Sequence, residues 1–304
     1  IRRSPWSSSD RIVEGMRSAP FEAAGVRKFL DEMTRADGHP PLSEHKMATL
    51  GGAGSLAGVW SDHAGLCLVA VAAWHPGDGH WAIEAAVAPR RRTPEDEVAA
   101  VERATGIIPT GEPHSFWAFR PGQVEAALGL GYEQIRAVLK MSGPMPTAGA
   151  GSVPGISIEP MAERDIEAIV GVNNRAFADH REQGSMTVDG FRLLMGLGWF
   201  DPRGVHVARS SDRIVGFCMA KHEERAVGEV FVLAVDPDLA GSGIGRALVD
   251  RAFAGLADQG AVRAQAWVDA DNLPAVGLYE ALGLAEDFRT SELVPAAGGE
   301  GPAG

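Results

Sequence analysis

The two halves of the chain repeat one another, and this repeat limits the folds that the sequence can adopt. Glu84–Pro89 (EAAVAP) echoes Glu229–Pro237, which also begins with a glutamate and ends in Ala-Val-x-Pro. Ala127–Leu130 and Ala281–Leu284 both read ALGL. Because similar elements follow in a similar order, the sequence predicts two tandem copies of one α/β unit of about 145 residues.

A segment of small residues, glycines and prolines separates the two copies. Residues 142–155 read SGPMPTAGAGSVPG, a composition that cannot build a core and is typical of a flexible connector. The sequence therefore predicts a first domain over 1–141, this connector, a second domain over 156–295 and an unstructured tail over 296–304.

Composition excludes several classes of protein. A net charge of −12 argues against broad nucleic-acid binding, which needs a basic face. No apolar run reaches the ~18 residues of a membrane span, and no signal-peptide pattern is visible, so we expect a cytoplasmic protein without membrane contact, although Ile1 in place of Met leaves a processed segment open. The nine histidines include no pair with metal-ligand spacing, so no metal site is predicted. Cys67 and Cys218 lie in apolar runs and are expected in cores.

The stretch Gly228–Gly245 carries the strongest functional signal. Glu229 precedes an apolar run, Val230–Val235, which is typical of a strand buried on both faces. A break at residues 236–238 and three glycines then precede a predicted helix. A helix N-terminus presents unpaired N–H groups and the positive end of the helix dipole. The stretch therefore predicts a phosphate site with a carboxylate one strand-length away.

Three interpretations of the glycine loop compete. A Walker loop ends in Gly-Lys-Ser/Thr, whereas Gly245 is followed by Arg246. A dinucleotide-binding loop has G-x-G-x-x-G at the first strand of its fold, whereas this loop has G-x-G-x-G late in its domain. The third is the pyrophosphate loop of the GNAT N-acetyltransferases, Gln/Arg-x-x-Gly-x-Gly/Ala. Ala240–Gly245 matches both glycines and lacks the leading basic or amide residue.

A second motif favours the third interpretation. Residues 272–284 resemble the GNAT motif Asn-x-x-Ala-x-x-x-Tyr-x-x-x-Gly-Phe, with only the last aromatic replaced, by Leu284. The resemblance implies a mixed α+β fold of two tandem GNAT-like domains, each a central mixed, mostly antiparallel sheet flanked by helices. It also implies acetyl-CoA as acetyl donor, no metal, and a cofactor lying where strands Val230–Val235 and Val262–Asp269 diverge.

Residue roles follow from this resemblance. Glu229 is the candidate base, because a carboxylate at the head of a buried strand is costly unless it is solvated or used. Tyr279 stands at the general-acid position; a core tyrosine is the alternative. The predicted cofactor-binding residues are Leu233, Ala234, Val235, Gly241, Ser242, Gly243, Ile244, Gly245, Arg246, Asn272, Leu273, Pro274, Ala275, Val276 and Gly277. Asn272 would bind the pantetheine arm or cap its helix.

Part of the second domain resembles a narrower family. Asn173–Gly184, Trp199–Pro202 and Gly228–Leu233 are similar to the mycothiol synthases, tandem GNAT enzymes that acetylate the cysteine amine of desacetylmycothiol by direct attack in a ternary complex. The resemblance implies that Glu229 engages the amine. It also implies that Glu182, Lys221 and, from the first domain, Glu44 contact the acceptor. Alternatively, Glu182 and Lys221 are solvated surface charges. The assignment of Glu44 rests on a short sequence match.

The first domain departs from the loop pattern. Its aligned residues are Thr93, Pro94 and Glu95, of which Pro94 lacks an N–H donor and Glu95 would repel phosphate. Arg90–Arg92 would bind phosphate or form a solvated turn. We therefore predict that this domain is catalytically silent and serves as a wall and partner surface.

Two other functions stay open. One is a tandem GNAT that acetylates an antibiotic, a polyamine or a peptide N-terminus. The other is a non-catalytic acetyl-CoA-binding module, which would need neither Glu229 nor Tyr279. In each case we expect a monomer or weak oligomer with a small-molecule partner.

Overall fold

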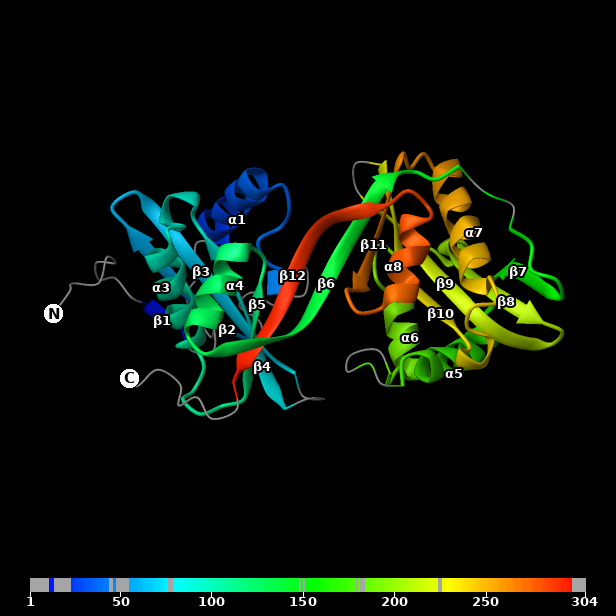
Figure 1. Cartoon of the computed structure of the whole chain (residues 1–304), viewed down its shortest axis with the longest axis horizontal. Coiled ribbons are helices and arrows are strands. Elements are labelled where there is room, and N and C mark those ends of the chain that lie inside the picture. Colours follow the sequence, from blue (N-terminus) through cyan, green and yellow to red (C-terminus); the bar gives the residue numbers. More distant parts are fainter. Residues whose placement is uncertain are drawn as a thin grey trace. The chain divides into compact units, whose positions relative to one another are not determined.

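The structure, a computed structural model, describes residues 11–13, 23–43, 46–47, 55–75, 79–147, 149, 151–178, 180, 184–223 and 226–296. The chain forms two compact units. The first unit comprises Ile1–Val138 and Phe288–Gly304, and the second comprises Leu139–Asp287. In each unit helices lie against a sheet (Figure 1), so the predicted mixed α/β class is confirmed.

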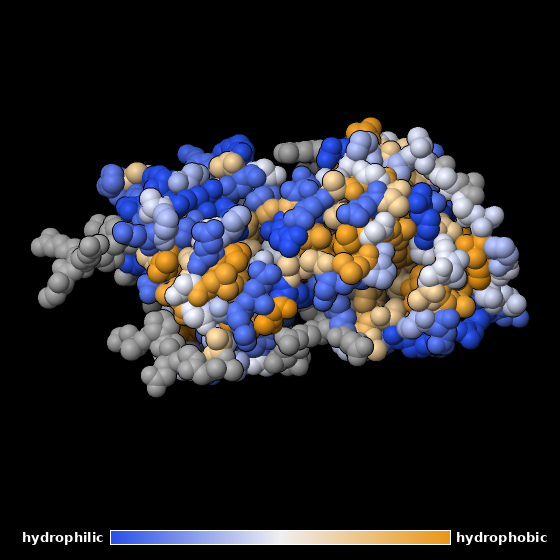
Figure 2. Space-filling view, in the orientation of Figure 1, coloured by the Kyte–Doolittle hydropathy of each residue, from blue (hydrophilic) through white to orange (hydrophobic). Residues whose placement is uncertain are grey.

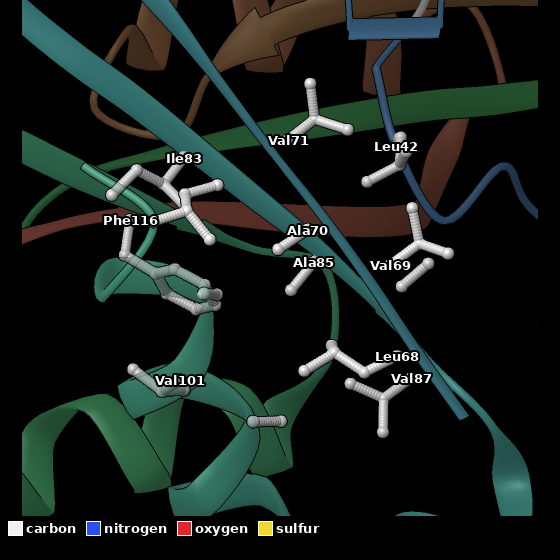
Figure 3. Close-up of a cluster of buried hydrophobic side chains, with 14 of the residues drawn as sticks. Leu42, Leu68, Val69, Ala70, Val71, Ile83, Ala85, Val87, Val101 and Phe116 are labelled. Atoms are coloured by element: carbon white, nitrogen blue, oxygen red, sulfur yellow. The ribbon is translucent and has the colours of Figure 1, made fainter. Parts of the chain in front are cut away.

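The sheet of the first unit is built around two apolar strands. Its strands follow the order β1 (Arg11–Val13), β2 (Ser55–Asp62), β3 (Gly65–His75), β4 (His80–Val87), β5 (His114–Ala118) and β12 (Ala285–Pro295). Every pair is antiparallel except β4 with β5. The helices are α1 (Ala23–Asp37), α3 (Pro94–Thr105) and α4 (Pro121–Gly129). Side chains of β3 and β4, such as Leu68 and Ile83, pack with Val101 of α3 in a buried cluster (Figure 3).

The second unit repeats this plan. Its strands follow the order β6 (Tyr132–Pro144), β11 (Arg263–Asp269), β10 (Val227–Val235), β9 (Arg213–Glu223), β8 (Val205–Ser210) and β7 (Ile156–Pro160). β10 pairs with β11 in parallel, and the strands from β10 to β7 pair antiparallel. The helices are α5 (Ile166–Ala176), α6 (Val188–Met195), α7 (Ile244–Asp258) and α8 (Leu273–Glu280).

Two buried clusters divide the second unit by sheet face. One cluster combines Val230 of β10 with residues of α7 and α8, such as Phe253 and Tyr279. The other combines Ala234 of β10 with residues of α5 and α6, such as Phe191. The sheet is therefore covered on both faces, which explains the unbroken apolar run of β10.

Two strands pass from one unit to the other. Leu139 and Met141 of β6 are buried in the core of the second unit, whereas Leu293 of β12 is buried in the core of the first. β6 also extends to Pro144, into the segment predicted as a connector. The compact units therefore differ from the predicted domains, 1–141 and 156–295, at both crossing strands.

Among the described residues, no helix combines the length and the apolar character needed to cross a membrane.

Candidate functional site

Strands β10 and β11 pair over only part of their length. The parallel pairing runs from Val227 opposite Arg263 to Val230 opposite Ala266. Both strands continue beyond this point, to Val235 and Asp269. The register with β9 shifts between Val230 and Val232, as in a β-bulge. As expected, the strands diverge, and the pairing of β10 with β11 does not extend to residues 231–235.

The glycine loop leads from the end of β10 into α7. Gly241 and Gly243 have φ values of +76° and +85°, a region in which a Cβ is unfavourable. Gly243 is the N-cap of α7 and provides no side-chain cap. The first helical bond is donated by Ala247 to the Gly243 carbonyl. The N–H groups of residues 244–246 therefore precede the helical ladder at the positive end of the helix dipole.

Side chains of this loop are occupied elsewhere. Ser242 Oγ donates to the carbonyl of Leu239 at 2.6 Å. Arg246 Nε donates to Asp250 Oδ1 at 2.9 Å, one turn along α7. An anion bound here would therefore be held mainly by backbone N–H groups.

The start of α8 is capped and faces solvent. Asn272 Oδ1 accepts from the N–H of Ala275 at 3.2 Å, so the capping role considered for Asn272 is present. Leu273 is 71% exposed, and Trp267 of β11 is 43% exposed. Figure 2 shows hydrophobic side chains gathered over the region of α8 on the visible face of the second unit. Such an apolar surface suits the aliphatic part of a ligand.

Glu229 lies at the centre of a row of polar side chains. The sheet register sets it opposite Gln265 of β11 on one side and Lys221 of β9 on the other. Gln265 Nε2 donates to Glu229 Oε2 at 2.5 Å, and Lys221 Nζ lies 3.3 Å from Oε1. Burial raises the pKa of Glu229, while the Lys221 charge and the Gln265 hydrogen bond lower it. Glu229 is buried, so the alternative of a solvated strand-end residue is wrong.

Lys221 is also buried. Its ammonium lies 2.5 Å from Glu223 Oε1 and within 5.5 Å of two ring centroids, at 5.4 Å from Trp199 and 5.2 Å from Phe231. Carboxylates and aromatic faces both stabilise an ammonium. The alternative of a solvated surface charge is therefore wrong for Lys221.

Tyr279 approaches the strand divergence from the other face of the sheet. Tyr279 is 4% exposed and belongs to the same buried cluster as Val230 of β10. Glu229 precedes Val230 on this strand, and because side chains alternate along a strand, Glu229 points to the opposite face. Burial raises the pKa of Tyr279, and the nearby carboxylate of Glu229 raises it further. The hydroxyl therefore keeps its proton at neutral pH.

Two predicted acceptor residues, Glu44 and Glu182, lie outside the described residues. The structure describes their neighbours. Ser43, next to Glu44, donates to Glu84 from both its N–H and its Oγ, each at 2.7 Å. His180, near Glu182, lies with Nε2 at 3.1 Å from Asp269 Oδ2 at the end of β11.

The corresponding strands of the first unit diverge in the same way but are bridged. The pairing of β4 with β5 ends at Glu84 opposite Trp117. Beyond it, Gln123 Nε2 donates to the Ala85 carbonyl and Gln123 Oε1 accepts from the N–H of Phe119, both at 2.9 Å. The Gln123 side chain is buried, so it fills the gap between strands.

The helix after β4 also differs from α7. Thr93 caps α3 by accepting from the N–H of Asp96, and the first turn carries Glu95, Asp96 and Glu97. Negative side chains there oppose anion binding. The preceding arginines have internal partners: Arg90 and Arg91 bind Asp62, and Arg92 binds Asp37. They hold the turn in place, so a purely solvated turn is wrong.

Sequence reasoning missed Gln265 and Gln123. Neither belongs to a motif, and only the strand register and the tertiary contacts reveal their partners. Within the part of the chain that the structure describes, no three His, Cys, Asp or Glu side chains gather as metal ligands.

Comparisons with known proteins agree with this geometry. The family model described as "Acetyltransferase (GNAT) family" matches residues 173–284. A mycothiol acetyltransferase of Propionibacterium freudenreichii is 34% identical over 283 residues, covering 86% of this chain and 86% of the relative. One of Actinosynnema mirum is 35% identical over 284 residues, covering 87% and 93%.

Two solved structures share the fold along almost the whole chain. A GCN5-related N-acetyltransferase from Sphaerobacter thermophilus has a TM-score of 0.71 at 18% identity, covering 94% of each chain. A tandem GNAT protein from the clavulanic acid biosynthesis pathway has a TM-score of 0.68 at 15% identity, covering 97% of this chain and 100% of its own. The predicted arrangement of two tandem domains of this fold is thereby confirmed.

Proposed function

The chain belongs to the GNAT acetyltransferase family, and from this premise we propose that it transfers an acetyl group from acetyl-CoA to the cysteine amine of desacetylmycothiol. The relatives support the choice of acceptor, because they are named mycothiol acetyltransferases and match most of the chain. The structural observation that most supports acetyl transfer is the buried Glu229, which lies between Gln265 and Lys221 where β10 and β11 diverge.

The second unit fits the donor. When bound, acetyl-CoA supplies the acetyl group as a reactive thioester. The backbone of residues 241–246 would hold its pyrophosphate, because the glycines keep the N–H groups accessible at the start of α7. The backbone of Leu233–Val235 would bind the carbonyl and the pantetheine arm, and residues 272–277 would lie beside that arm.

Glu229 acts as the base in this proposal. An amine attacks only when neutral, and a free amine with a pKa near 8 is largely protonated at neutral pH. Glu229 accepts that proton directly or through a water, and burial suits it to the task by raising its pKa. The amine then attacks directly in a ternary complex.

Tyr279 acts as the acid. The departing thiolate needs a proton, and the buried hydroxyl retains one at neutral pH. Glu229, the base, and Tyr279, the acid, lie on opposite faces of the sheet. The reacting groups would therefore meet between them, where β10 and β11 diverge.

Contacts to the acceptor complete the proposal. Lys221 lies beside Glu229 and would meet the same part of the acceptor. Glu182 and Glu44, which lie outside the described residues, stay predicted acceptor contacts. A tandem GNAT acting on another amine stays the alternative. A non-catalytic acetyl-CoA-binding module is no longer an alternative, because the chain belongs to a family of acetyltransferases.

The test is an acceptor panel with acetyl-CoA. It includes desacetylmycothiol, a cysteinyl glucosamine, a polyamine, an aminoglycoside and a short peptide. Because two of these acceptors carry a thiol, thiol release is not a clean signal, and products are identified by mass spectrometry after thiol alkylation. We expect N-acetylation of desacetylmycothiol with the highest kcat/KM. Turnover of another amine without desacetylmycothiol would refute this acceptor.

A further inference from the structure

Three side chains cross adjacent strands of the second unit in one row: Gln265 of β11, Glu229 of β10 and Lys221 of β9. We propose that Gln265 is a positioning residue for acetyl transfer, whose amide holds Oε2 of Glu229 so that Oε1 takes the proton of the amine. This inference rests on the proposed role of Glu229 as base.

The sheet itself fixes this pair. Glu229 and Gln265 are direct neighbours in the parallel ladder, one position before the pairing ends at Val230 opposite Ala266. Opposite positions on adjacent strands bring Cβ atoms to about 5 Å, so the contact needs no loop to form. The ladder therefore holds Gln265 against Glu229 one position before the strands diverge.

The hydrogen bond is short and involves a charge. Nε2 of Gln265 donates to Oε2 at 2.5 Å. Bonds between an N–H and a carboxylate are roughly twice as strong as neutral ones, and they favour the ionised form. An amide carries no charge of its own, so Gln265 stabilises the carboxylate without competing for its proton.

Lys221 cannot provide this contribution alone. Its ammonium is shared between Glu229 Oε1 and Glu223 Oε1, and the nearer of the two is Glu223. The Gln265 amide, in contrast, bonds Oε2 and leaves Oε1 on the side of Lys221. Among the described residues, the charged and titratable groups that interact with Glu229 are Lys221 and Glu223 on β9 and Tyr279 on α8. Gln265 is the neutral donor among these neighbours.

Variants at position 265 test the inference. Gln265→Leu keeps the size of the side chain and removes the donor, and Gln265→Glu replaces the donor by a second carboxylate. With the amine that the panel identifies, we expect the acidic limb of kcat to move to higher pH by about one unit in Gln265→Leu, and further in Gln265→Glu. At pH values below the acidic limb kcat should therefore be about tenfold lower in Gln265→Leu, and it should recover at high pH. The KM for acetyl-CoA should stay unchanged, as should all values in the control Gln259→Leu, at an exposed glutamine.

A second measurement needs no acceptor. In protein labelled with ¹³C at glutamate carboxyls, the Glu229 resonance is assigned by its loss in Glu229→Gln and titrated with pH. An upward shift of its midpoint in Gln265→Leu supports the inference. An unchanged midpoint, or a rate lowered equally at every pH, overturns it. Failure of the proposed function would show separately, as wild-type protein that does not acetylate desacetylmycothiol.

Discussion

The ammonium of Lys221 lies 3.3 Å from Oε1 of Glu229, and each of the two side chains is only 5% exposed. Opposite charges withdrawn from water in this way depend on one another, because removing one leaves the other buried and uncompensated. The pair therefore links the ionisation of the candidate base to a residue on a different strand.

Lys221→Met should move the acidic limb of the activity to higher pH. Loss of the ammonium removes the largest influence that lowers the pKa of Glu229, so burial raises that pKa further. The base works in its deprotonated form, so activity below the shifted limb should fall about tenfold for each unit of the shift and should partly recover at high pH. A rise in the acceptor KM at every pH, without a shifted limb, would instead indicate that Lys221 acts only as an acceptor contact. Lys140→Met, at a more exposed lysine, is the control.

Glu229→Gln should lower kcat by about 10²- to 10⁴-fold, the range for loss of a general base. The affinity for acetyl-CoA, measured by calorimetry, should change little, because the glycine loop and the start of α8 supply the proposed donor contacts. Glu280→Gln, on the exposed side of α8, is the matched control. An unaltered rate across the pH range would remove Glu229 as the base.

Tyr279→Phe should slow the release of the thiolate. The substitution removes only the hydroxyl of a buried side chain, so the core around Val230 should be retained. We expect kcat to fall by about 10²-fold, with both KM values nearly unchanged, in steady-state kinetics. Thermal unfolding checks that the variant is folded. Wild-type turnover in a folded Tyr279→Phe protein would contradict the acid role.

Gly243→Ala should weaken acetyl-CoA binding. At φ +85° a Cβ strains the backbone at the start of α7, which would displace the N–H groups proposed to hold pyrophosphate. We expect the Kd to rise at least tenfold, corresponding to roughly 1.4 kcal/mol. The control is Gly255→Ala, in the same helix, because a Cβ at Gly255 would meet nothing within 4 Å. This variant should leave the Kd unchanged. Equal affinity in the two variants would argue against the loop as the donor site.

Calorimetry of the full chain should find one acetyl-CoA site. Gln123 bridges Ala85 and Phe119 in the first unit, and the first turn of α3 is acidic. Both features support the proposal that the first domain is silent. The Gly243→Ala variant isolates any second site, because its own donor site is weakened. A second, tight site in that variant would refute the silent first domain.

The sequence was sufficient where local pattern determines structure. The glycines at 241 and 243 predicted a turn that the structure forms with positive φ, and the apolar run after Glu229 predicted a strand covered on both faces. The motif around Asn272 correctly indicated a capped helix.

The remaining features depend on long-range pairing. The residues of β12 do not by themselves identify a partner strand, and in the structure β12 pairs antiparallel with β5, a strand in the first unit. Likewise, nothing near Gln265 or Gln123 in the chain reveals that one faces a carboxylate and the other fills a gap between strands. Such roles become visible only when the register of neighbouring strands is known.

The return of β12 to the first unit has a consequence for synthesis on the ribosome. Leu293 is fully buried in the first core, and Thr290 donates to the carbonyl of Ala118 at 2.9 Å. Domains generally fold in order as they emerge, but the first unit lacks this strand until the entire second unit has been translated. Its β5 edge must stay unsatisfied during that interval, exposed to wrong partners. We therefore expect chaperones to shield the β5 edge of the nascent chain until β12 has been synthesised.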